Sequence, residues 1–388
     1  MCGFTGFFNY PELNNSINLD NFTNIIKNRG PDESKVLNID KKLIFIFARL
    51  SIVDLTNTGN QPMTSKSGKY VMLFNGEFYN HKEIRKKLEI QGYKFTGTSD
   101  TEILLESFEY FGLDFLNKIQ GMYSIVLFDK ENSFLYLIND RFGEKPLYFH
   151  YDKKTIFFSS DIKSFTFKKR KLNPKAISNY FNNYVIGYPN TIWEGVQRIE
   201  PSQILKFKLN FTEEKVNLIE SKKYWYNKNI HNTFTKDNIQ KSADKLENLL
   251  FSIIEKQLDN DTTTGCFLSG GIDSTLVSAI ASKIKKNLIT LSIGFSDKKL
   301  DESRYAIKIA EHLKTNHHNK IFNSDEIGNI FNEIPKVYGE PFADSSQLPT
   351  MLLSKFASSK VKVALTGDGG DELFGGYDRY TFVPKFWK

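Results

Sequence analysis

The sequence predicts two consecutive domains of different class, an α+β domain followed by an α/β domain. Residues 1–205 alternate short apolar and aromatic runs with turns at hairpin spacing, which is typical of mostly antiparallel sheets. Residues 239–388 instead alternate helical patterns with short apolar runs, which predicts a doubly wound parallel sheet. A chain of 388 residues is long enough for two or three domains, each with its own core.

In the first domain, β-branched and aromatic runs predict strands, and amphipathic stretches predict helices. The expected strands are 43–47, 70–74, 123–128, 134–138, 146–151 and 155–159, and the expected helices are 19–27, 82–91 and 101–111. The pattern loosens over 206–238, where polar residues surround Lys222-Lys223-Tyr224-Trp225-Tyr226. We interpret this stretch as a linker that packs across the domain junction through its aromatic side chains.

The second domain is expected to begin with a helix and then to alternate strands and helices. The predicted strands are 263–268, 288–293, 317–322 and 361–366, and the predicted helices are 239–256, 274–285, 302–313, 325–337 and 346–359. Ligands of doubly wound sheets bind beyond the carboxyl ends of the strands. The loops after strands 263–268 and 361–366 are therefore the candidate binding loops.

The first candidate loop is Leu268-Ser269-Gly270-Gly271-Ile272-Asp273-Ser274. Its backbone N–H groups and the positive end of the following helix suit an anion, and its two glycines allow a phosphate to approach closely. It is not the P-loop of kinases and GTPases, because no Gly-Lys-Ser/Thr follows. The aspartate indicates Mg²⁺ between a carboxylate and phosphates, so the loop predicts a site for nucleotide pyrophosphate. The alternative is a plain strand-to-helix turn with glycines for geometry.

The second candidate loop is Thr366-Gly367-Asp368-Gly369-Gly370-Asp371-Glu372. Three acids separated by glycines after a core strand favour a metal or substrate role over a solvated turn. Two Gly/Asp-rich loops that meet at one crevice are more specific than either loop alone.

Composition excludes several classes of function. The net charge of +7 is spread along the chain, and the run Lys168-Lys169-Arg170-Lys171 lacks interleaved aromatic residues, so a solvated turn is favoured over nucleic-acid binding. No segment approaches the ~18 apolar residues of a membrane helix, and the N-terminus lacks a signal-peptide pattern. The two cysteines, Cys2 and Cys266, fit a reducing cytosol, and the six histidines show no zinc spacing.

Cys2 is a candidate nucleophile that needs no histidine. If the initiator methionine is removed, the thiol lies beside its own α-amine. A free α-amine has a pKa of about 7.7–8.0 and a thiol about 8.5, so the amine can accept the thiol proton near neutral pH.

Further motifs give this cysteine a context. They are Met1-Cys2-Gly3, Arg29-Gly30-Pro31-Asp32, Arg49-Leu50-Ser51-Ile52-Val53-Asp54, Phe74-Asn75-Gly76-Glu77-Phe78-Tyr79-Asn80 and Thr98-Ser99-Asp100-Thr101-Glu102. These motifs resemble class II glutamine amidotransferases. With 269–274 and 365–377, the whole chain resembles the family of glutamine-hydrolysing asparagine synthetases. The resemblance implies an N-terminal-nucleophile domain, whose antiparallel sheets are sandwiched by helices, followed by an ATP pyrophosphatase domain.

The resemblance also implies roles for residues of the first domain. Cys2 attacks the carboxamide of glutamine, a thioester forms, and water releases glutamate. Asn75 and Gly76 match the family's oxyanion positions. The residues implied to bind glutamine are Arg49 for its carboxylate, Glu77 and Asp100 for its ammonium and amide, together with Ile52 and Asn75.

In the second domain the resemblance implies that a carboxylate attacks the α-phosphate of ATP, and that ammonia then displaces AMP from the acyl-adenylate. The residues implied to bind ATP are Leu268, Ser269, Gly270, Gly271, Asp273, Ser274, Ile293, Thr366 and Gly367. Asp273 and Asp371 are implied to bind Mg²⁺, and Asp368 matches an acidic residue that acts in adenylate formation. The family passes ammonia through an internal tunnel, which the aromatic residues of 206–238 are candidates to line.

The sequence departs from the family in two respects. It stops soon after Gly375-Gly376-Tyr377, where the family continues into a helical region with a catalytic lysine, so we expect an incomplete C-terminal domain. The segment Glu340-Pro341-Phe342-Ala343-Asp344-Ser345-Ser346 is similar to a bacterial subgroup with enzymes of surface-polysaccharide clusters. The alternatives to asparagine synthesis are therefore amidation of another carboxylate, such as a sugar uronate, and a glutaminase or nucleotide-binding fragment without synthetase activity.

The expected partners follow from these roles. They are glutamine, ATP with Mg²⁺, and aspartate or another small carboxylate, with no prosthetic group, nucleic acid or membrane. A second copy in a homodimer and a separate polypeptide that supplies the C-terminal region both remain open. The expected location is the cytoplasm.

Overall fold

The computed structural model describes residues 2–387 apart from 14–15, 168, 228–237 and 298–300. The chain divides into two compact units. Unit 1 comprises Met1–Thr233 and Pro335–Ala343, and unit 2 comprises Phe234–Ile334 and Asp344–Lys388.

The described part of unit 1 contains two six-stranded sheets in which the paired strands run antiparallel. The first sheet has the order β10 (Gln197–Arg198), β8 (Tyr148–Tyr151), β9 (Ile156–Ser159), β1 (Gly3–Phe8), β3 (Leu43–Arg49) and β2 (Glu33–Asn38). The second has the order β12 (Lys215–Lys223), β11 (Gln203–Asn210), β7 (Phe134–Asn139), β6 (Gly121–Asp129), β5 (Tyr70–Phe78) and β4 (Met63–Thr64).

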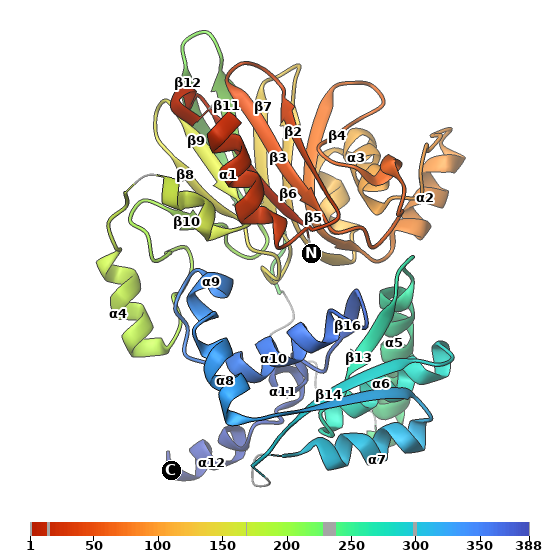
Figure 1. Cartoon of the computed structure of the whole chain (residues 1–388). Coiled ribbons are helices and arrows are strands. Elements are labelled where there is room, and N and C mark those ends of the chain that lie inside the picture. The colour runs from red at the N-terminus through yellow and green to blue at the C-terminus, as the bar shows by residue number, and fades with distance from the viewer. Residues whose placement is uncertain (1, 14–15, 168, 228–237, 298–300, 388) are drawn as a thin grey trace. The chain divides into compact units, whose positions relative to one another are not determined.

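Helices cover the outer faces of both sheets, so unit 1 has four layers (Figure 1). Helix α1 (Ser16–Lys27) packs on the first sheet, and α2 (His81–Ile90) and α3 (Asp100–Phe111) pack on the second. A third apolar cluster, with side chains from both sheets, fills the space between them. Because side chains alternate along a strand, β5 sends Val71 and Leu73 into this central cluster and Met72 and Phe74 toward the helices.

The remaining helical segments of unit 1 are short. They are α4 (Pro174–Asn183) and the 3₁₀ turns η1 (Pro11–Leu13), η2 (Asn57–Gly59), η3 (Gly112–Asn117) and η4 (Ile162–Phe167). The predicted α+β sandwich is confirmed, whereas β1, β2 and α4 lie where no strand or helix was predicted.

The predicted linker 206–238 is wrong over its first half, because residues up to Lys223 belong to β11 and β12. Along β11, Leu205, Phe207 and Leu209 are buried, while Lys206 and Lys208 alternate with them. These lysines lie over aromatic rings such as Phe134, so the alternation of a strand was mistaken for a polar stretch. The rest of the predicted linker includes 228–237, which lie outside the described residues.

The aromatic residues of that stretch lie in unit 1. The Tyr224 hydroxyl is 2.8 Å from the Tyr123 hydroxyl, and the Trp225 ring contacts the Phe142 ring edge-on. That they pack across a domain junction or line an ammonia tunnel stays a prediction.

Unit 2 is built on a parallel sheet with the order β15 (Asn316–Phe322), β14 (Ile289–Phe295), β13 (Thr264–Phe267) and β16 (Val363–Leu365). Its helices are α5 (Ile239–Leu258), α6 (Ile272–Ile284), α7 (Ser303–Leu313), α8 (Ser324–Phe331), α9 (Ile334–Tyr338, which crosses into unit 1), α10 (Gln347–Ala357), α11 (Gly370–Phe374) and α12 (Asp378–Phe386).

Helices lie on both faces of this sheet. Cys266 of β13 packs with side chains of α5 and α6, whereas its neighbour Phe267 packs with side chains of α10. The doubly wound prediction is therefore confirmed. The strand order reverses between β13 and β16, and such a switch point is where ligands bind in open α/β sheets.

The predicted helix 325–337 is instead two helices, α8 and α9. Pro335 lies at the start of α9, where a residue without a backbone N–H is tolerated, and it disfavours a continuous helix through the residue before it.

The segment 335–343 packs on unit 1. The Glu340 carboxylate accepts a hydrogen bond from Ile192 N at 2.7 Å, and the Lys163 ammonium donates to Lys336 O at 2.8 Å. The segment 340–346, which resembles a bacterial subgroup, is thus divided, with residues up to Ala343 in unit 1 and residues from Asp344 onward in unit 2.

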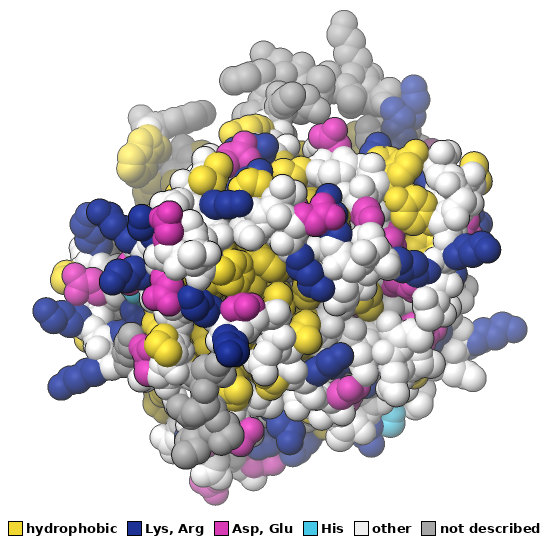
Figure 2. Space-filling model, turned by 90° about the horizontal axis from the view of Figure 1, so that it is seen from above, with side chains coloured by type: hydrophobic (Ala, Val, Ile, Leu, Met, Phe, Trp, Pro, Cys, Tyr) yellow, Lys and Arg dark blue, Asp and Glu magenta, His cyan; other side chains and the backbone are white. Residues whose placement is uncertain are grey.

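The face of the molecule in Figure 2 carries lysine and arginine side chains interspersed with aspartate and glutamate. No helix in the described part of the chain combines the length and apolar composition that crossing a membrane requires.

Candidate functional site

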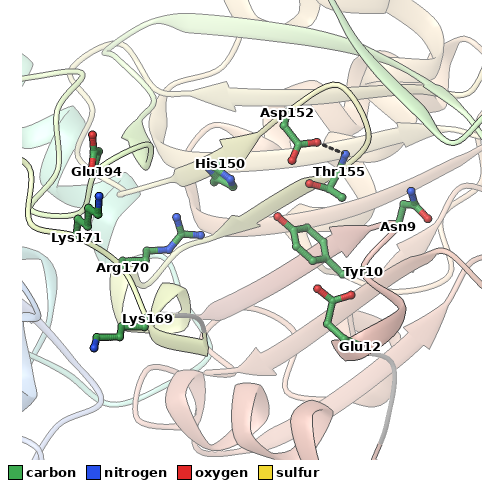
Figure 3. Close-up of a pocket in the computed structure, with 10 residues that line it drawn as sticks. All are labelled: Asn9, Tyr10, Glu12, His150, Asp152, Thr155, Lys169, Arg170, Lys171 and Glu194. Atoms are coloured by element: carbon green, nitrogen blue, oxygen red, sulfur yellow. Dashed lines mark hydrogen bonds between the residues drawn. The ribbon is translucent and has the colours of Figure 1, made fainter.

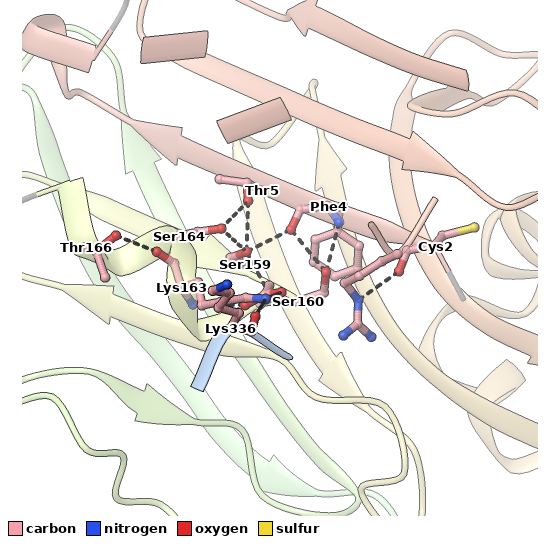
Figure 4. Close-up of polar contacts among 11 residues, drawn as sticks. Cys2, Phe4, Thr5, Ser159, Ser160, Lys163, Ser164, Thr166 and Lys336 are labelled. Atoms are coloured by element: carbon pink, nitrogen blue, oxygen red, sulfur yellow. Dashed lines mark hydrogen bonds and ion pairs between the residues drawn. The ribbon is translucent and has the colours of Figure 1, made fainter. Parts of the chain in front are cut away.

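Cys2 directly precedes β1 and is held from two sides. Its thiol is 3.7 Å from Leu50 O, as donor, and 3.5 Å from Leu50 N, as acceptor, in the loop after β3. Arg29 Nε donates to Cys2 O at 3.3 Å. Figure 4 shows the Cys2 sulfur pointing away from the serine cluster that anchors the start of β1, in which Ser160 Oγ accepts from Phe4 N. Hydrogen bonds therefore hold the backbone of Cys2 and Phe4 in place, while the Cys2 sulfur points away from these bonds.

The surroundings of Cys2 oppose its ionisation. Burial raises the pKa of the thiol, and the nearby Glu77 and Asp100 carboxylates raise it further, while the positive N-terminal amine opposes them. The thiol therefore needs a local proton acceptor to become a nucleophile near neutral pH.

Asn75 has a buried amide group without a partner. Its side chain is fully buried, and neither Nδ2 nor Oδ1 has a hydrogen-bond partner among the described residues. Asn75 projects from the same face of β5 as Leu73, into the apolar cluster against which Cys2 packs. A buried amide left unpaired is costly, so this group is suited to a ligand.

Gly76 brings two backbones close together. A Cβ at this position would lie 2.1 Å from Met122 O and 2.7 Å from Tyr123 Cα on β6. Only glycine fits here, so no side chain of residue 76 covers the backbone of β5 at this point.

Arg49, at the end of β3, is buried and organises the following loop. Its guanidinium donates to Thr56 O at 2.7 Å, to Asn60 Oδ1 at 2.6 Å and to Asp54 O. These bonds use three of the five N–H donors of an arginine. Arg49 is therefore held rigidly by its own loop, and its predicted contact with a glutamine carboxylate stays a prediction.

Asp54 ties this loop to the loop before α3. Burial opposes ionisation of its carboxyl, but hydrogen bonds from Thr56, Thr58 and Thr98 outweigh burial and lower its pKa to about 2. No role was predicted for Asp54, although it belongs to the motif that begins at Arg49. An aspartate followed by threonines two and four residues later, as in Asp54-Leu55-Thr56-Asn57-Thr58, is the signal that would have identified these hydrogen bonds.

Two acidic side chains, Glu77 and Asp100, complete this region. Asp100 is buried at the start of α3 and accepts from Phe78 N at 3.2 Å, next to Glu77 in sequence. Burial raises the pKa of Asp100, and burial together with the Asp100 charge raises the pKa of Glu77 to about 8. Two carboxylates that burial penalises are suited to pair with a ligand ammonium group.

Ile52, which was predicted to bind glutamine, is half-buried in the loop after β3.

Lys145 is a buried charged residue that sequence reasoning missed. It is buried, and burial lowers its pKa, with Glu144, Arg29 and Glu77 among the charges that act on it. The local sequence shows only its acidic neighbours Asp140 and Glu144, whereas Arg29 and Glu77 come from distant parts of the chain and leave no local pattern.

A separate hollow of about 320 Å³ lies at the other end of β1 (Figure 3). Arg170 projects into it between His150 and Tyr10, and acidic side chains such as Glu12 and Asp152 also line it. A six-residue strand is about 20 Å long, so this hollow is not part of the Cys2 site.

In unit 2, the loop after β13 leads directly into α6. Gly271 is the N-cap of α6 and no side chain caps it, so the first N–H groups of the helix are open to an anion. Gly270 has φ +92°, and a Cβ there would lie 2.8 Å from Tyr305 Cβ of α7. The hydroxyls of Ser269 and Ser274 lie 2.9 Å apart across the loop.

The loop after β16 meets the loop after β13, as the switch point predicts. A Cβ on Gly367 would lie 2.6 Å from Ser274 N, and a Cβ on Gly370 would lie 2.4 Å from Asp273 Cγ. Glycines at these two positions therefore allow the loops to touch. Asp368 is exposed beside them, and its N–H donates to Thr366 Oγ1 at 3.2 Å.

The two acids predicted to bind Mg²⁺ lie on these two loops. The Asp273 carboxylate lies against Gly370, and Asp371 follows Gly370 directly. The described residues contain no group of three or more His, Cys, Asp or Glu side chains that would hold a metal alone. Mg²⁺ commonly takes one or two carboxylates and completes its shell with phosphates and water, so the residue types suit Mg²⁺, and that Asp273 and Asp371 bind it together with ATP stays a prediction.

Leu268 and Ile293, two residues predicted to contact ATP, lie in or beside the core of unit 2. Leu268 is buried against Ala306 and Ala310 of α7, so its side chain belongs to the core. Ile293 is half-buried in β14, the strand next to β13. Whether either residue contacts the adenylate group stays a prediction.

Comparison with known families matches both halves of the chain. A family model for a glutamine amidotransferase domain matches residues 1–225, and a family model named asparagine synthase matches residues 245–388.

Several proteins resemble the chain over nearly its whole length. Glutamine-hydrolyzing asparagine synthetase 1 of Bacillus subtilis is 32% identical over 98% of this chain and 59% of the relative. A Methanocaldococcus jannaschii protein, named putative glutamine-hydrolyzing asparagine synthetase 2, is 31% identical over 97% of this chain and 76% of the relative. Asparagine synthetase 2 of Bacillus subtilis is 31% identical over 97% of this chain and 52% of the relative. The chain thus spans between half and three quarters of the length of these relatives.

Proposed function

Since the chain belongs to the family of glutamine-hydrolysing asparagine synthetases, we propose that unit 1 hydrolyses glutamine and unit 2 activates a carboxylate with ATP. The activated carboxylate is that of aspartate, and the product is asparagine. The observation that carries this proposal is the buried Asn75 amide, which has no hydrogen-bond partner among the described residues and lies on the face of β5 toward which Cys2 packs.

Glutamine hydrolysis begins at the Cys2 sulfur. The thiol transfers its proton to a local base, and the α-amine of Cys2 serves once the initiator methionine is removed. Sulfur attacks the carboxamide carbon, and the π electrons of the carbonyl move to its oxygen. Asn75 Nδ2 and Gly76 N stabilise that oxyanion. As the tetrahedral intermediate collapses, the protonated base returns its proton to the carboxamide nitrogen, which leaves as ammonia. Water then cleaves the thioester to glutamate and the free thiol.

Recognition of glutamine uses the charges around this nucleophile. Glu77 and Asp100 accept its ammonium group, which favours their ionised forms although burial alone raises the pKa of both. The Arg49 guanidinium, fixed by its loop, pairs with the glutamine carboxylate.

Unit 2 binds ATP where its two loops meet. The open N-terminus of α6 and the hydroxyls of Ser269 and Ser274 bind the pyrophosphate portion. The aspartate carboxylate attacks the α-phosphorus, pyrophosphate leaves, and ammonia nitrogen then attacks the acyl carbon and displaces AMP. Mg²⁺ held with ATP by Asp273 and Asp371 would neutralise phosphate charge.

The test measures two products in parallel. Pyrophosphate release is followed with ATP, Mg²⁺, ammonium and aspartate, and glutamate release is followed with glutamine. Aspartate-dependent pyrophosphate release together with glutamate release supports the proposal. Pyrophosphate release with a sugar uronate and not with aspartate contradicts the choice of acceptor. Glutamate release without pyrophosphate from any carboxylate contradicts the synthetase half.

The proposal also includes the cellular compartment. We expect the protein to act in the cytoplasm, which agrees with two free cysteines and no disulfide among the described residues.

A further inference from the structure

Ser124, in the middle of β6, has a buried hydroxyl that the proposed reaction does not use. The side chain is fully buried, and its Oγ has no hydrogen-bond partner among the described residues. Leaving a buried hydroxyl unpaired costs free energy, because the group has lost its hydrogen bonds to water. The Ser124 hydroxyl therefore lowers the stability of the folded protein unless it has a role that outweighs this cost.

The sheet register identifies the neighbours of Ser124. It lies directly opposite Asn75 on β5 and directly opposite Asn139 on β7, so the three polar side chains form a row on one face of the sheet. This face is the one that carries Leu73, Val126 and Leu137 into the space between the two sheets. The row thus lies on the face toward which Cys2 packs.

Of the two neighbours, only Asn75 has unpaired polar atoms. The Asn139 amide donates to Ile199 O at 3.2 Å and accepts from Asp140 N at 3.0 Å. Both ends of the Asn75 amide lack partners in the described residues. Side chains directly opposite each other in a sheet have Cβ atoms about 4.5–5.5 Å apart. No hydrogen bond joins the Ser124 hydroxyl to the Asn75 amide in this structure, and at the spacing of directly opposite side chains one bridging water reaches both groups.

An asparagine amide has a donor end and an acceptor end, and only the donor end stabilises an oxyanion. A hydroxyl that donates to the acceptor end holds that end in place and leaves the donor end free for the oxyanion. We propose that Ser124 is a positioning residue of the glutaminase site, whose hydroxyl donates through one bridging water to Asn75 Oδ1 and so directs Asn75 Nδ2 at the oxyanion. This inference rests on the proposed hydrolysis of glutamine at Cys2.

The test compares wild type with Ser124→Ala in the full chain. Because bound glutamine has no oxyanion and the negative charge develops only as sulfur attacks, the variant is expected to lower kcat for glutamate release roughly tenfold with little change in KM. The γ-aldehyde analogue of glutamine forms a tetrahedral adduct with a thiol, so its affinity is expected to fall by the same factor. Alkylation of Cys2 by iodoacetamide needs no oxyanion and is expected to proceed at the wild-type rate.

A matched control separates position from the loss of a buried hydroxyl. Ser107 is equally buried, on α3, and its hydroxyl donates to Ile103 O at 2.6 Å. Ser107→Ala is expected to lower thermal stability and to leave kcat unchanged. Ser124→Ala removes a hydroxyl without a protein partner, so its melting temperature is expected to stay the same or to rise.

The outcomes distinguish this inference from the proposed function. A wild type that releases no glutamate overturns both. An active wild type with unchanged kcat in Ser124→Ala overturns the role of Ser124 alone. A rise in KM without a fall in kcat, or equally slowed alkylation of Cys2, overturns it as well, because Ser124 would then act on glutamine binding or on the nucleophile.

Discussion

The candidate site of unit 1 and the candidate site of unit 2 are built by different means. Around Cys2, the groups that matter are buried side chains, among them Asn75 without a partner and Glu77 with a raised pKa. In unit 2, the open N-terminus of α6 and glycines at loop contacts form the site, and Asp368 is exposed.

This difference predicts which kind of substitution damages each site most. Unit 1 depends on the chemistry of individual side chains, so truncating one of them removes function while the fold persists. Unit 2 depends on backbone approach, so adding a single methyl group to a glycine is the more damaging change.

The largest expected effect tests the dependence of unit 1 on one side chain. Cys2→Ala removes the nucleophile and is expected to abolish glutamate release while ATP binding is unchanged. The measurements are a glutamate assay and ATP titration by calorimetry. Glutamate release at the wild-type rate would show that another group is the nucleophile.

A smaller effect is expected from the oxyanion donor. Asn75→Ala removes one preorganised donor, which costs about 10²–10³ in kcat at comparable sites. The variant also removes an unpaired buried amide, so its stability is not expected to fall as far as for a typical buried truncation. Steady-state kinetics and thermal unfolding check both parts. A stable variant with wild-type kcat would contradict the oxyanion assignment.

In unit 2, Gly270→Ala tests the dependence on backbone geometry. Gly270 has φ +92°, so alanine is expected to lower the free energy of unfolding by about 1–2 kcal/mol and to weaken ATP binding. Gly271→Ala is the matched comparison for stability, because Gly271 has φ −72° and its added Cβ meets only Ser269 Oγ at 3.4 Å. Denaturant unfolding of both variants gives the comparison. Equal loss of stability would mean that the left-handed backbone of Gly270 is not the cause.

The smallest expected effect is the pH dependence of Asp54. Its folded-state pKa of about 2 lies below the ordinary value of 3.8, so the contribution of Asp54 to stability is present above pH 3.8 and is lost as pH falls toward 2. The difference in unfolding free energy between wild type and Asp54→Asn is expected to be constant at neutral pH and to shrink below pH 4. If the difference in unfolding free energy stays constant down to pH 2, the ionised Asp54 carboxylate does not stabilise the two loops.

The sequence also misled at identifiable places. Strand β11 was not predicted because its lysines gave the stretch a polar composition. Long charged side chains can lie over aromatic rings and still belong to a sheet. Residues 335–343 lie far along the chain within the second predicted domain, yet they pack on unit 1 through the bond from Ile192 N to Glu340. Contacts between residues so distant in sequence leave no periodic signal.

The sequence by itself determined the two fold classes and the two loops of unit 2. Glycines and acids that directly follow an apolar strand are a local pattern, and the doubly wound topology brings the carboxyl ends of such strands together. It also pointed to Cys2, Asn75 and Arg49 through their motifs. Only the tertiary structure placed Ser124 opposite Asn75, held Arg49 within its own loop and raised the pKa of Glu77. The reason is physical, since strand register, burial and electrostatic fields arise from segments far apart in the chain.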